Sequence, residues 1–245
     1  MPASRFYQDK FFEEGETITI EDDEFHHLKN VMRHEQGDCI EIINGKGSLG
    51  FANLVEIKKK CALALINKVS FFEKTHDFII LQGMPKLNKL EILLEKGTEL
   101  GATEFHLFHA DKSSTKIINE KLHRMNLKLT SALKQSGRYY LPQIKMIPPI
   151  PKWEPSFQNA YFGALNENAP LLYNLLSKKE DLQPYFFCCG PEAGFSEKEI
   201  ELLNKKHFKG VSLHPNILRT ETAPLAFLSL VYHHLLIHGH RTIVN

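Results

Sequence analysis

The chain lacks several features that would assign it to a common class of protein. Its 245 residues hold only four cysteines, with no Cys-x-x-Cys pair, and no run of 18 apolar residues. A disulfide framework and a transmembrane helix are therefore excluded. The N-terminus has no apolar segment of the signal-peptide type. The adjacent Cys188 and Cys189 fit a buried strand better than a reactive site. We expect a cytoplasmic protein with no membrane partner.

An excess of one charge is also missing. Thirty Lys and Arg residues face 29 Asp and Glu residues, which gives a formal net charge of +1. The chain as a whole is therefore not basic, and any RNA contact must come from a local patch. No P-loop pattern occurs, and residues 190–196 do not match Gly-x-Gly-x-x-Gly. These absences disfavour P-loop and dinucleotide binding.

Residues 1–72 have the pattern of a small β domain. Strands are predicted over 17–20, 39–43, 48–57 and 61–69. The dipeptide Asn44-Gly45 is a strong signal for a tight turn between two of them. One short helix, which ends at Arg33 and His34, interrupts the strands. Short strands around a small helix are typical of a compact, RNA-binding β-barrel.

Residues 73–245 alternate strand and helix patterns. Strands are predicted over 78–82, 104–109, 143–147, 160–165, 185–189 and 210–213, and helices over 90–100, 122–133, 197 onward and 223–238. The proline cluster between 148 and 155 predicts a rigid, exposed connection. This alternation indicates a mostly parallel α/β sheet, in which ligands bind beyond the carboxyl ends of the strands. Three loops qualify, those after Leu165, Cys189 and Leu213.

The loop Gly190-Pro-Glu-Ala-Gly-Phe-Ser196 joins a buried strand to a helix opened by a Ser196–Glu199 capping box. Its two glycines allow a ligand to approach the backbone closely, and Pro191 stiffens the turn. Glu192 could accept hydrogen bonds from ribose hydroxyls or an amine. The alternative is an ordinary turn between a strand and a helix.

The stretch from Leu213 to Ala223 is the most informative one. It lies between a short strand pattern and a long apolar helix pattern, and it contains Arg219 and Glu221. A guanidinium and a carboxylate just before a helix suit a polar ligand. The alternative is a helix cap, with Thr220 or Thr222 as the N-cap residue.

Taken together, the segments 190–196 and 217–223 resemble the RsmE family of 16S rRNA (uracil-N3) methyltransferases, in the SPOUT superfamily. The resemblance extends over nearly the whole chain. Further matching segments are Arg5-Phe6-Tyr7, His27-Leu28, Val31-Met32-Arg33, Lys89 with Glu91, Lys96 to Gly101, and Ala132 to Arg138 followed by Pro142.

The resemblance implies a fold and an activity. Residues 1–72 would form a PUA-like β-barrel, and residues 73–245 a SPOUT α/β domain with a trefoil knot. The protein would be a homodimer that transfers a methyl group from S-adenosylmethionine to N3 of a uridine in 16S rRNA of the small ribosomal subunit. No metal is expected, because the histidines 233, 234, 238 and 240 lack a suitable partner carboxylate. Packing of that helix in the core or at a dimer interface is the alternative to a metal site.

The resemblance also suggests roles for single residues. Arg219 would stabilise negative charge on the uracil or bind phosphate, and Glu221 would be a base or would orient Arg219. The predicted cofactor-binding residues are Leu165, Glu167, Gly190, Pro191, Glu192, Gly194, Leu213, Pro215, Leu218, Thr220 and Thr222. The predicted RNA-binding residues are Arg5, Arg33, Lys86, Lys89, Lys112 and Arg138. The alternative for each of these cations is a solvated surface position.

The chain departs from the family pattern at several positions. They are Ala193 in the glycine loop, His214 and Asn216 before Ile217, Lys134 in place of an acid, and Ala110-Asp-Lys112. A side chain at 193 or 214 would cost about 1 kcal/mol or more if the backbone there required a positive φ. Two alternative functions are therefore an RNA-binding protein that has lost its cofactor and a methyltransferase of another RNA.

Overall fold

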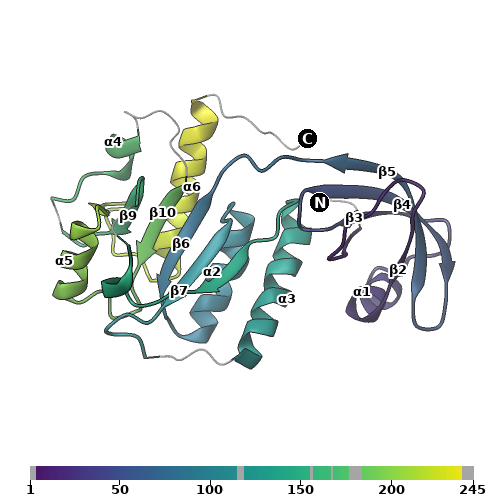
Figure 1. Cartoon of the computed structure of the whole chain (residues 1–245), viewed down its shortest axis with the longest axis horizontal. Coiled ribbons are helices and arrows are strands. Elements are labelled where there is room, and N and C mark those ends of the chain that lie inside the picture. Colours follow the sequence, from purple (N-terminus) through teal and green to yellow (C-terminus); the bar gives the residue numbers. More distant parts are fainter. Residues whose placement is uncertain (1–3, 115–118, 155–156, 167, 177–183, 239–245) are drawn as a thin grey trace. The chain divides into compact units, whose positions relative to one another are not determined.

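The computed structural model describes residues 4–114, 119–154, 157–166, 168–176 and 184–238 (Figure 1). The chain divides into two compact units. Unit 1 contains Met1–Lys74 and Thr130–Leu141, and unit 2 contains Thr75–Leu129 and Pro142–Asn245. Each unit has its own sheet. Among the described residues, no helix has both the length and the apolar character that a membrane span requires.

Unit 1 is built on a five-stranded sheet in the order β1-β3-β4-β5-β2. The strands are β1 (Arg5–Tyr7), β2 (Thr17–Ile20), β3 (Cys39–Ile43), β4 (Ser48–Ile57) and β5 (Ala62–Phe71). Helix α1 (Asp22–His26) continues as a π-helical turn, His27–Val31. The buried side chains alternate along the strands, as Ile18 and Ile20 do in β2, and meet Phe25 and Leu28 of the helical segment. This alternation is why the sequence predicted these strands.

The tight turn predicted at Asn44-Gly45 is confirmed. The Asn44 side chain is fully buried, and its Oδ1 accepts hydrogen bonds from the backbone N–H groups of Lys46 (2.8 Å) and Ser48 (3.0 Å). Gly45 has φ +67°, which glycine adopts without steric cost. The turn therefore fixes the antiparallel register of β3 and β4.

The second segment of unit 1 is the end of helix α3 (Asn119–Ser136) and the residues after it. Leu133 and Leu141 pack against the buried Ile43 and Leu49. The rings of Phe72 and Tyr139 are stacked, with centroids 3.7 Å apart. A segment far along the sequence, Thr130–Leu141, therefore completes the core of the N-terminal sheet.

Unit 2 is built on a six-stranded parallel sheet in the order β11-β9-β10-β6-β7-β8. The strands are β6 (Phe78–Gly83), β7 (Glu104–Phe108), β8 (Gln143–Met146), β9 (Ala160–Gly163), β10 (Tyr185–Cys189) and β11 (Lys209–Val211). The predicted α/β class and parallel sheet are confirmed. The chain runs outward from β6 to β8, returns to β9, and then inserts β10 between β9 and β6. Ligands bind at such changes of direction in parallel sheets.

Helices cover both faces of this sheet. The helices are α2 (Leu87–Glu99), α4 (Leu172–Leu176), α5 (Glu197–Lys205) and α6 (Thr222–Ile237). Phe187 of β10 stacks on Phe227 of α6, with ring centroids 4.6 Å apart. Its neighbour Cys188 points to the other face and packs in the cluster that contains Leu203 of α5. Both cysteines of β10 are buried, as predicted.

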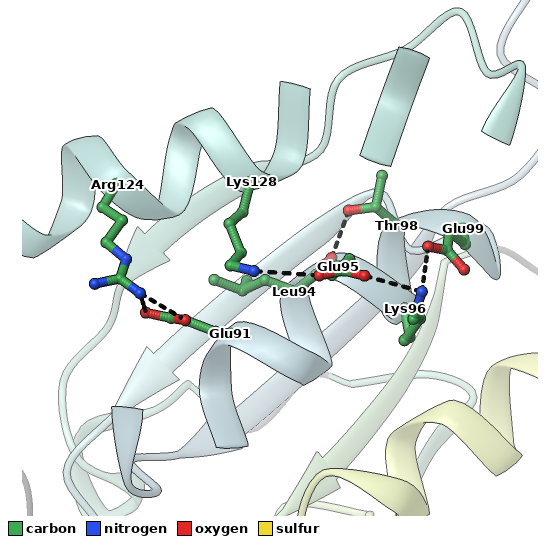
Figure 2. A network of polar contacts seen from close by, with 8 residues as sticks. All are labelled: Glu91, Leu94, Glu95, Lys96, Thr98, Glu99, Arg124 and Lys128. Carbon is green, nitrogen blue, oxygen red and sulfur yellow. Dashed lines mark hydrogen bonds and ion pairs between the residues drawn. The ribbon is translucent and has the colours of Figure 1, made fainter. Parts of the chain in front are cut away.

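An ion-pair network covers the outer face of α2 (Figure 2). Arg124 and Lys128 of α3 pair with Glu91 and Glu95 at 3.1 and 3.2 Å. Lys96 pairs with both Glu95 and Glu99 of the same helix. The opposite side of α2 is apolar and packs on the sheet, so the helix has one buried and one charged face.

The prediction that the proline cluster is exposed is wrong in part. This connection contains a short 3-10 helix, Ile150–Lys152, and both Ile150 and Trp153 are buried in the core beside β7 and β9. The Trp153 indole N–H donates to the carbonyl of Pro148 at 2.6 Å. The prolines restrict the backbone, but they do not prevent the residues between them from packing.

Candidate active site

Gln82 connects three segments at the carboxyl edge of the parallel sheet. It is the penultimate residue of β6 and is fully buried. Its Nε2 donates to the carbonyl of Gly190 (3.0 Å), which follows β10, and to the hydroxyl of Thr220 (3.0 Å), which follows β11. The Thr220 hydroxyl in turn donates to the Gly190 carbonyl at 2.6 Å. The predicted loops after Cys189 and after Leu213 therefore lie side by side.

The third predicted loop, which follows β9, is bonded to the segment after β11. The backbone N–H of Leu172 donates to the Ser212 carbonyl at 3.2 Å, and the Ser212 N–H donates to the Pro170 carbonyl at 2.9 Å. Leu165 and Ile217 project large apolar side chains into solvent and are 76% and 81% exposed. Such exposure at a ligand-binding edge suits an aromatic or apolar ligand surface.

The glycine loop is tightly folded. A Cβ atom on Gly190 would lie 3.0 Å from the carbonyl carbon of Gly194, so only glycine fits without a shift of the backbone. Gly194 has φ +68° and donates its N–H to the Pro191 carbonyl at 2.8 Å. After it, the predicted capping box is confirmed, because the Ser196 and Glu199 side chains each bond to the other's backbone N–H.

The loop after β7 holds the glycine loop from the other side. The Lys112 ammonium donates to the carbonyls of Ala193 (3.3 Å) and Phe195 (3.0 Å). The Ser196 hydroxyl donates to the Asp111 carboxylate at 2.6 Å. Lys112 was predicted to bind RNA, but its ammonium is engaged with the protein's own backbone. Its geometry supports a part in shaping the glycine loop.

The predicted ligand residue Glu192 is exposed and bonded to the start of α2. Its Oε1 accepts the backbone N–H of Lys86 at 2.9 Å. Lys86 is the N-cap residue of that helix and is exposed. The bond therefore ties the glycine loop to α2.

Glu221 and Lys89 form an ion pair that the sequence did not indicate. The Lys89 Nζ lies 2.5 Å from Glu221 Oε1, and the side chains are 22% and 9% exposed. The other carboxylate oxygen, Oε2, is buried and has no hydrogen-bond partner among the residues that the structure describes. Burial raises the pKa of the Glu221 carboxyl, but the bond from Lys89, the residue's own backbone N–H and the charges of Lys89 and Arg219 outweigh it, so the pKa lies below its ordinary value. Glu221 is therefore ionised at neutral pH.

The alternative in which Thr220 or Thr222 caps α6 is contradicted by the structure. The N-cap residue is Glu221, and no side chain makes a capping hydrogen bond there. The Thr220 hydroxyl is used by Gly190 and Gln82 instead, and Thr222 is the first helical residue. The tertiary contacts of Thr220 replace the local cap that its residue type favours.

Arg219 is exposed, and within the described part of the chain it forms no hydrogen bond or ion pair with Glu221. The structure therefore does not show Glu221 orienting Arg219, which was one of the two roles predicted for Glu221. Of the other predicted cofactor-binding residues, Leu213 and Leu218 are half-buried and Pro215 is exposed. Glu167 lies outside the described residues.

The predicted RNA-binding residues of unit 1 differ in accessibility. The Arg5 side chain is only 6% exposed, pairs with Glu41 at 2.6 Å and lies over the Tyr139 ring. A phosphate could reach Arg5 only if this pair opened. Arg33 is exposed and has φ +58° at the end of the π-helical turn, and Arg138 is half-buried.

The departures from the family pattern cause no backbone strain at the glycine loop or before Ile217. Neither Ala193 nor His214 has a positive φ. The conditional cost predicted for these side chains therefore does not arise. Lys134 pairs with Glu24 of α1 at 2.6 Å, which compensates its positive charge inside unit 1.

Sequence reasoning missed Gln82, Asp111 and the ion pair of Lys89. The signal for Gln82 was available, because a polar side chain follows four apolar residues within a buried strand. The rings of His234 and His238 lie 4.4 Å apart, and His240 lies outside the described residues. Among the described residues, no three His, Cys, Asp or Glu side chains gather as a metal-binding group.

Comparison with known proteins places this geometry in context. A family model described as an RNA methyltransferase domain matches residues 73–232, and one described as an RNA methyltransferase PUA domain matches residues 20–66. Ribosomal RNA small subunit methyltransferase E of Bacillus subtilis is 29% identical over 237 residues, which cover 89% of this chain and 91% of that protein. Ribosomal RNA small subunit methyltransferase E 2 of Borreliella burgdorferi is 30% identical over 218 residues, with 85% and 88% covered.

A solved structure agrees with these matches. The crystal structure of a ribosomal RNA small subunit methyltransferase E from Neisseria gonorrhoeae bound to S-adenosyl methionine superposes with a TM-score of 0.82. It is 26% identical in sequence, and the alignment covers 95% of this chain and 98% of that one.

Proposed function

Because this chain belongs to the RNA methyltransferase family, with an N-terminal PUA-like domain, we propose that it methylates N3 of a specific uridine in 16S rRNA. The relatives named as small-subunit methyltransferases align with it over most of their length. The observation that carries the proposal is the joining of three loops at one sheet edge. There an exposed Arg219 lies two residues from an ionised Glu221 with a free oxygen.

The residues at this edge fit S-adenosylmethionine. Gln82 Oε1 and Glu221 Oε2 are buried acceptors without a donor, and such oxygens are costly unless a ligand N–H reaches them. The exposed Leu165 suits the face of an adenine ring. The candidates for holding the cofactor are backbone and side-chain groups of Leu165, Glu167, Gly190, Pro191, Glu192, Gly194, Leu213, Pro215, Leu218, Thr220 and Thr222. When bound, the cofactor supplies a methyl group activated by a sulfonium.

The protein's own residues would expose and orient the uracil. Uracil N3 carries a proton and lies on the base-pairing edge, so the base must leave its pair before it reacts. Arg219 would stabilise the negative charge that grows on the uracil carbonyl oxygens as N3 loses its proton. Glu221 is ionised and would accept a hydrogen bond from N3–H or the proton itself.

We propose a smaller RNA footprint than the sequence suggested. In unit 2, Lys86 and Arg219 are exposed, whereas Lys89 and Lys112 are engaged with the protein. In unit 1, Arg33 is exposed and Arg138 half-buried. Exposed guanidinium and ammonium groups suit phosphate, and binding should weaken steeply with salt.

Several larger features of the family are also proposed for this chain. They are a PUA-like barrel over 1–72, a SPOUT domain over 73–245 with a trefoil knot, a homodimer and a cytoplasmic location. The insertion of β10 between β9 and β6 supports the knot. Exposed apolar residues of α4 and α6 support the dimer; they are Tyr173, Leu230 and Ile237.

The replacement Arg219→Ala tests the site. We expect a fall in kcat of about 100-fold, as for other lost oxyanion donors, with little change in the affinity for S-adenosylmethionine. Arg124→Ala is the matched control, because Arg124 is 71% exposed and pairs with Glu91 on the outer face of α2. Near-normal turnover by Arg219→Ala on small-subunit particles would remove Arg219 from the chemistry.

A further inference from the structure

Lys89 and Glu221 come from opposite ends of unit 2's sequence, 132 positions apart. Lys89 lies in the first turn of α2, and Glu221 is the N-cap residue of α6. Their bond uses only one carboxylate oxygen, Oε1. The second oxygen is buried and has no partner. The side chain is therefore held by one oxygen while the other stays available.

A second buried acceptor belongs to Gln82, which is hydrogen-bonded to the residue before Glu221. Gln82 directs its Nε2 to Thr220, the residue before Glu221, while its own Oε1 is buried without a donor. Unpaired buried acceptors are rare in folded proteins, because each loses its hydrogen bonds to water. Two of them beside one loop indicate that a ligand with N–H groups completes the site.

The charged and titratable groups around Glu221 come from three elements. Lys89 reaches it from α2, Arg219 from the preceding loop, and the Cys189 thiol from β10. Burial and, to a smaller extent, the charge of Glu221 raise the pKa of that thiol to about 12, so Cys189 stays neutral. Lys89 is thus the cation that is bonded to Glu221. Without it, burial would raise the pKa of the carboxyl and favour the protonated form.

Resting on the proposed function, we infer that Lys89 is a positioning residue of the methyl transfer: it holds Glu221 so that the free Oε2 accepts an N–H donor of the bound ligands. This role replaces RNA phosphate binding, for which an exposed ammonium would be needed. Two N–H donors of the ligands could bind to Oε2: the uracil N3–H and the ammonium of the cofactor's methionine part. Both require an ionised carboxylate with one free oxygen.

The first test compares Lys89→Met with Lys96→Met. Both remove a paired lysine from α2, but within the described part of the chain Lys96 pairs only with Glu95 and Glu99 on the outer face (Figure 2). We expect Lys89→Met to lower kcat at least about tenfold and to leave the salt dependence of RNA binding unchanged, and Lys96→Met to behave as wild type. The inference is overturned if Lys89→Met keeps its kcat, raises the KM for RNA and reduces the slope of log K against log salt by about 1.

The pH dependence gives a readout that a purely structural role would not move. As the pH is lowered, the Lys89→Met rate should fall at a higher pH than the wild-type rate, because Glu221 without Lys89 takes up a proton more readily; the wild-type profile should stay flat over that range. Lys89→Arg should restore the flat profile. If Lys89→Met does not fold, Lys89→Gln serves in its place, because its amide can still donate to Oε1 but carries no charge.

Glu221→Gln separates the two donor sources. Weaker binding of S-adenosylhomocysteine would identify the cofactor ammonium, and unchanged binding with a lower kcat would identify the nucleobase. Either result supports the inference, and no change in both overturns it. A carbon-13 titration of the Glu221 carboxyl, with and without Lys89, tests the pair without any transfer reaction. If the wild-type chain methylates no rRNA, the proposed function fails while this titration still decides the role of Lys89.

Discussion

The side-chain nitrogen of Gln82 lies 3.0 Å from the hydroxyl oxygen of Thr220, and this contact joins β6 to the loop that carries Arg219 and Glu221. The same nitrogen reaches the carbonyl of Gly190, so one amide fixes both loops. Gln82 is fully buried, which makes these bonds strong and their loss costly. The arrangement of the two loops in the candidate site therefore depends on Gln82, a residue of the strand beneath them.

Replacement of Gln82 by Leu should destabilise the protein and loosen both loops. Leucine keeps most of the volume, but it leaves the Gly190 carbonyl and the Thr220 hydroxyl without this donor. We expect the free energy of unfolding to fall by about 1–3 kcal/mol and the affinity for S-adenosylhomocysteine to fall about tenfold. Denaturant titration and calorimetry measure these quantities. Gln143→Leu, at an exposed position of β8, is the control; an equal loss in both variants would contradict the role of Gln82.

The two glycines of the loop 190–196 should respond differently to alanine. At Gly190 the new Cβ would lie 3.0 Å from backbone atoms of Gly194, so the loop must shift. At Gly194 no atom lies within 4 Å, and the cost is limited to the positive φ, about 1 kcal/mol. We expect Gly190→Ala to abolish detectable binding of S-adenosylhomocysteine and Gly194→Ala to weaken it only about fivefold. The reverse order of effects would show that the steric argument is incorrect.

The parts of the fold that the sequence predicted are those with local signals. Strand 185–189 was recognisable from its apolar character, and the pair Ser196 and Glu199 predicted a helix start that the structure contains. Asn44-Gly45 specified a turn through backbone angles that few residues tolerate.

The parts that escaped prediction depend on contacts between distant segments. No spacing rule connects Lys89 with Glu221, and Lys89 was therefore assigned to RNA as a free cation. A helix cap was the alternative role for Thr220 because its residue type favours it, but its hydroxyl donates to the Gly190 carbonyl in the folded chain. Trp153 was predicted to lie in an exposed connection, yet the sheet buries it. In each case a contact between distant segments of the chain supplied a partner or an environment that no local preference indicated.

Lys112 should act on the cofactor rather than on RNA. Lys112→Met removes the donor to the Ala193 and Phe195 carbonyls, so the glycine loop should loosen. We expect the Kd for S-adenosylhomocysteine to rise about tenfold, which corresponds to about 1.4 kcal/mol, while the salt dependence of RNA binding stays unchanged. Lys198→Met, an exposed position on α5, is the control for charge. A reduced salt slope with unchanged cofactor affinity would instead assign Lys112 to the RNA.

The ion pair of Lys134 and Glu24 should explain why this chain tolerates a lysine where the family has an acid. Their side chains are 14% and 21% exposed, so two carboxylates there would repel each other strongly. We expect Lys134→Glu to lower the free energy of unfolding by about 1–3 kcal/mol. The double variant with Glu24→Lys should recover part of this loss. Recovery would be incomplete, because Glu24 also accepts the backbone N–H of Tyr7.

If the double variant is no more stable than Lys134→Glu alone, the ion pair does not account for the substitution. Unfolding in urea at low and high salt would separate the charge effect from a packing effect, because salt weakens only the former.

The central claim is tested most directly by mapping modified bases in 16S rRNA from cells with and without the gene. Methylation at N3 blocks the base-pairing edge of uracil, so reverse transcription stops at the modified position, and mass spectrometry of the isolated fragment identifies the base. The account predicts one N3-methyluridine that disappears without the gene and returns with the wild-type chain but not with Arg219→Ala. An unchanged 16S rRNA, or a methyl group lost from a different RNA, would contradict it.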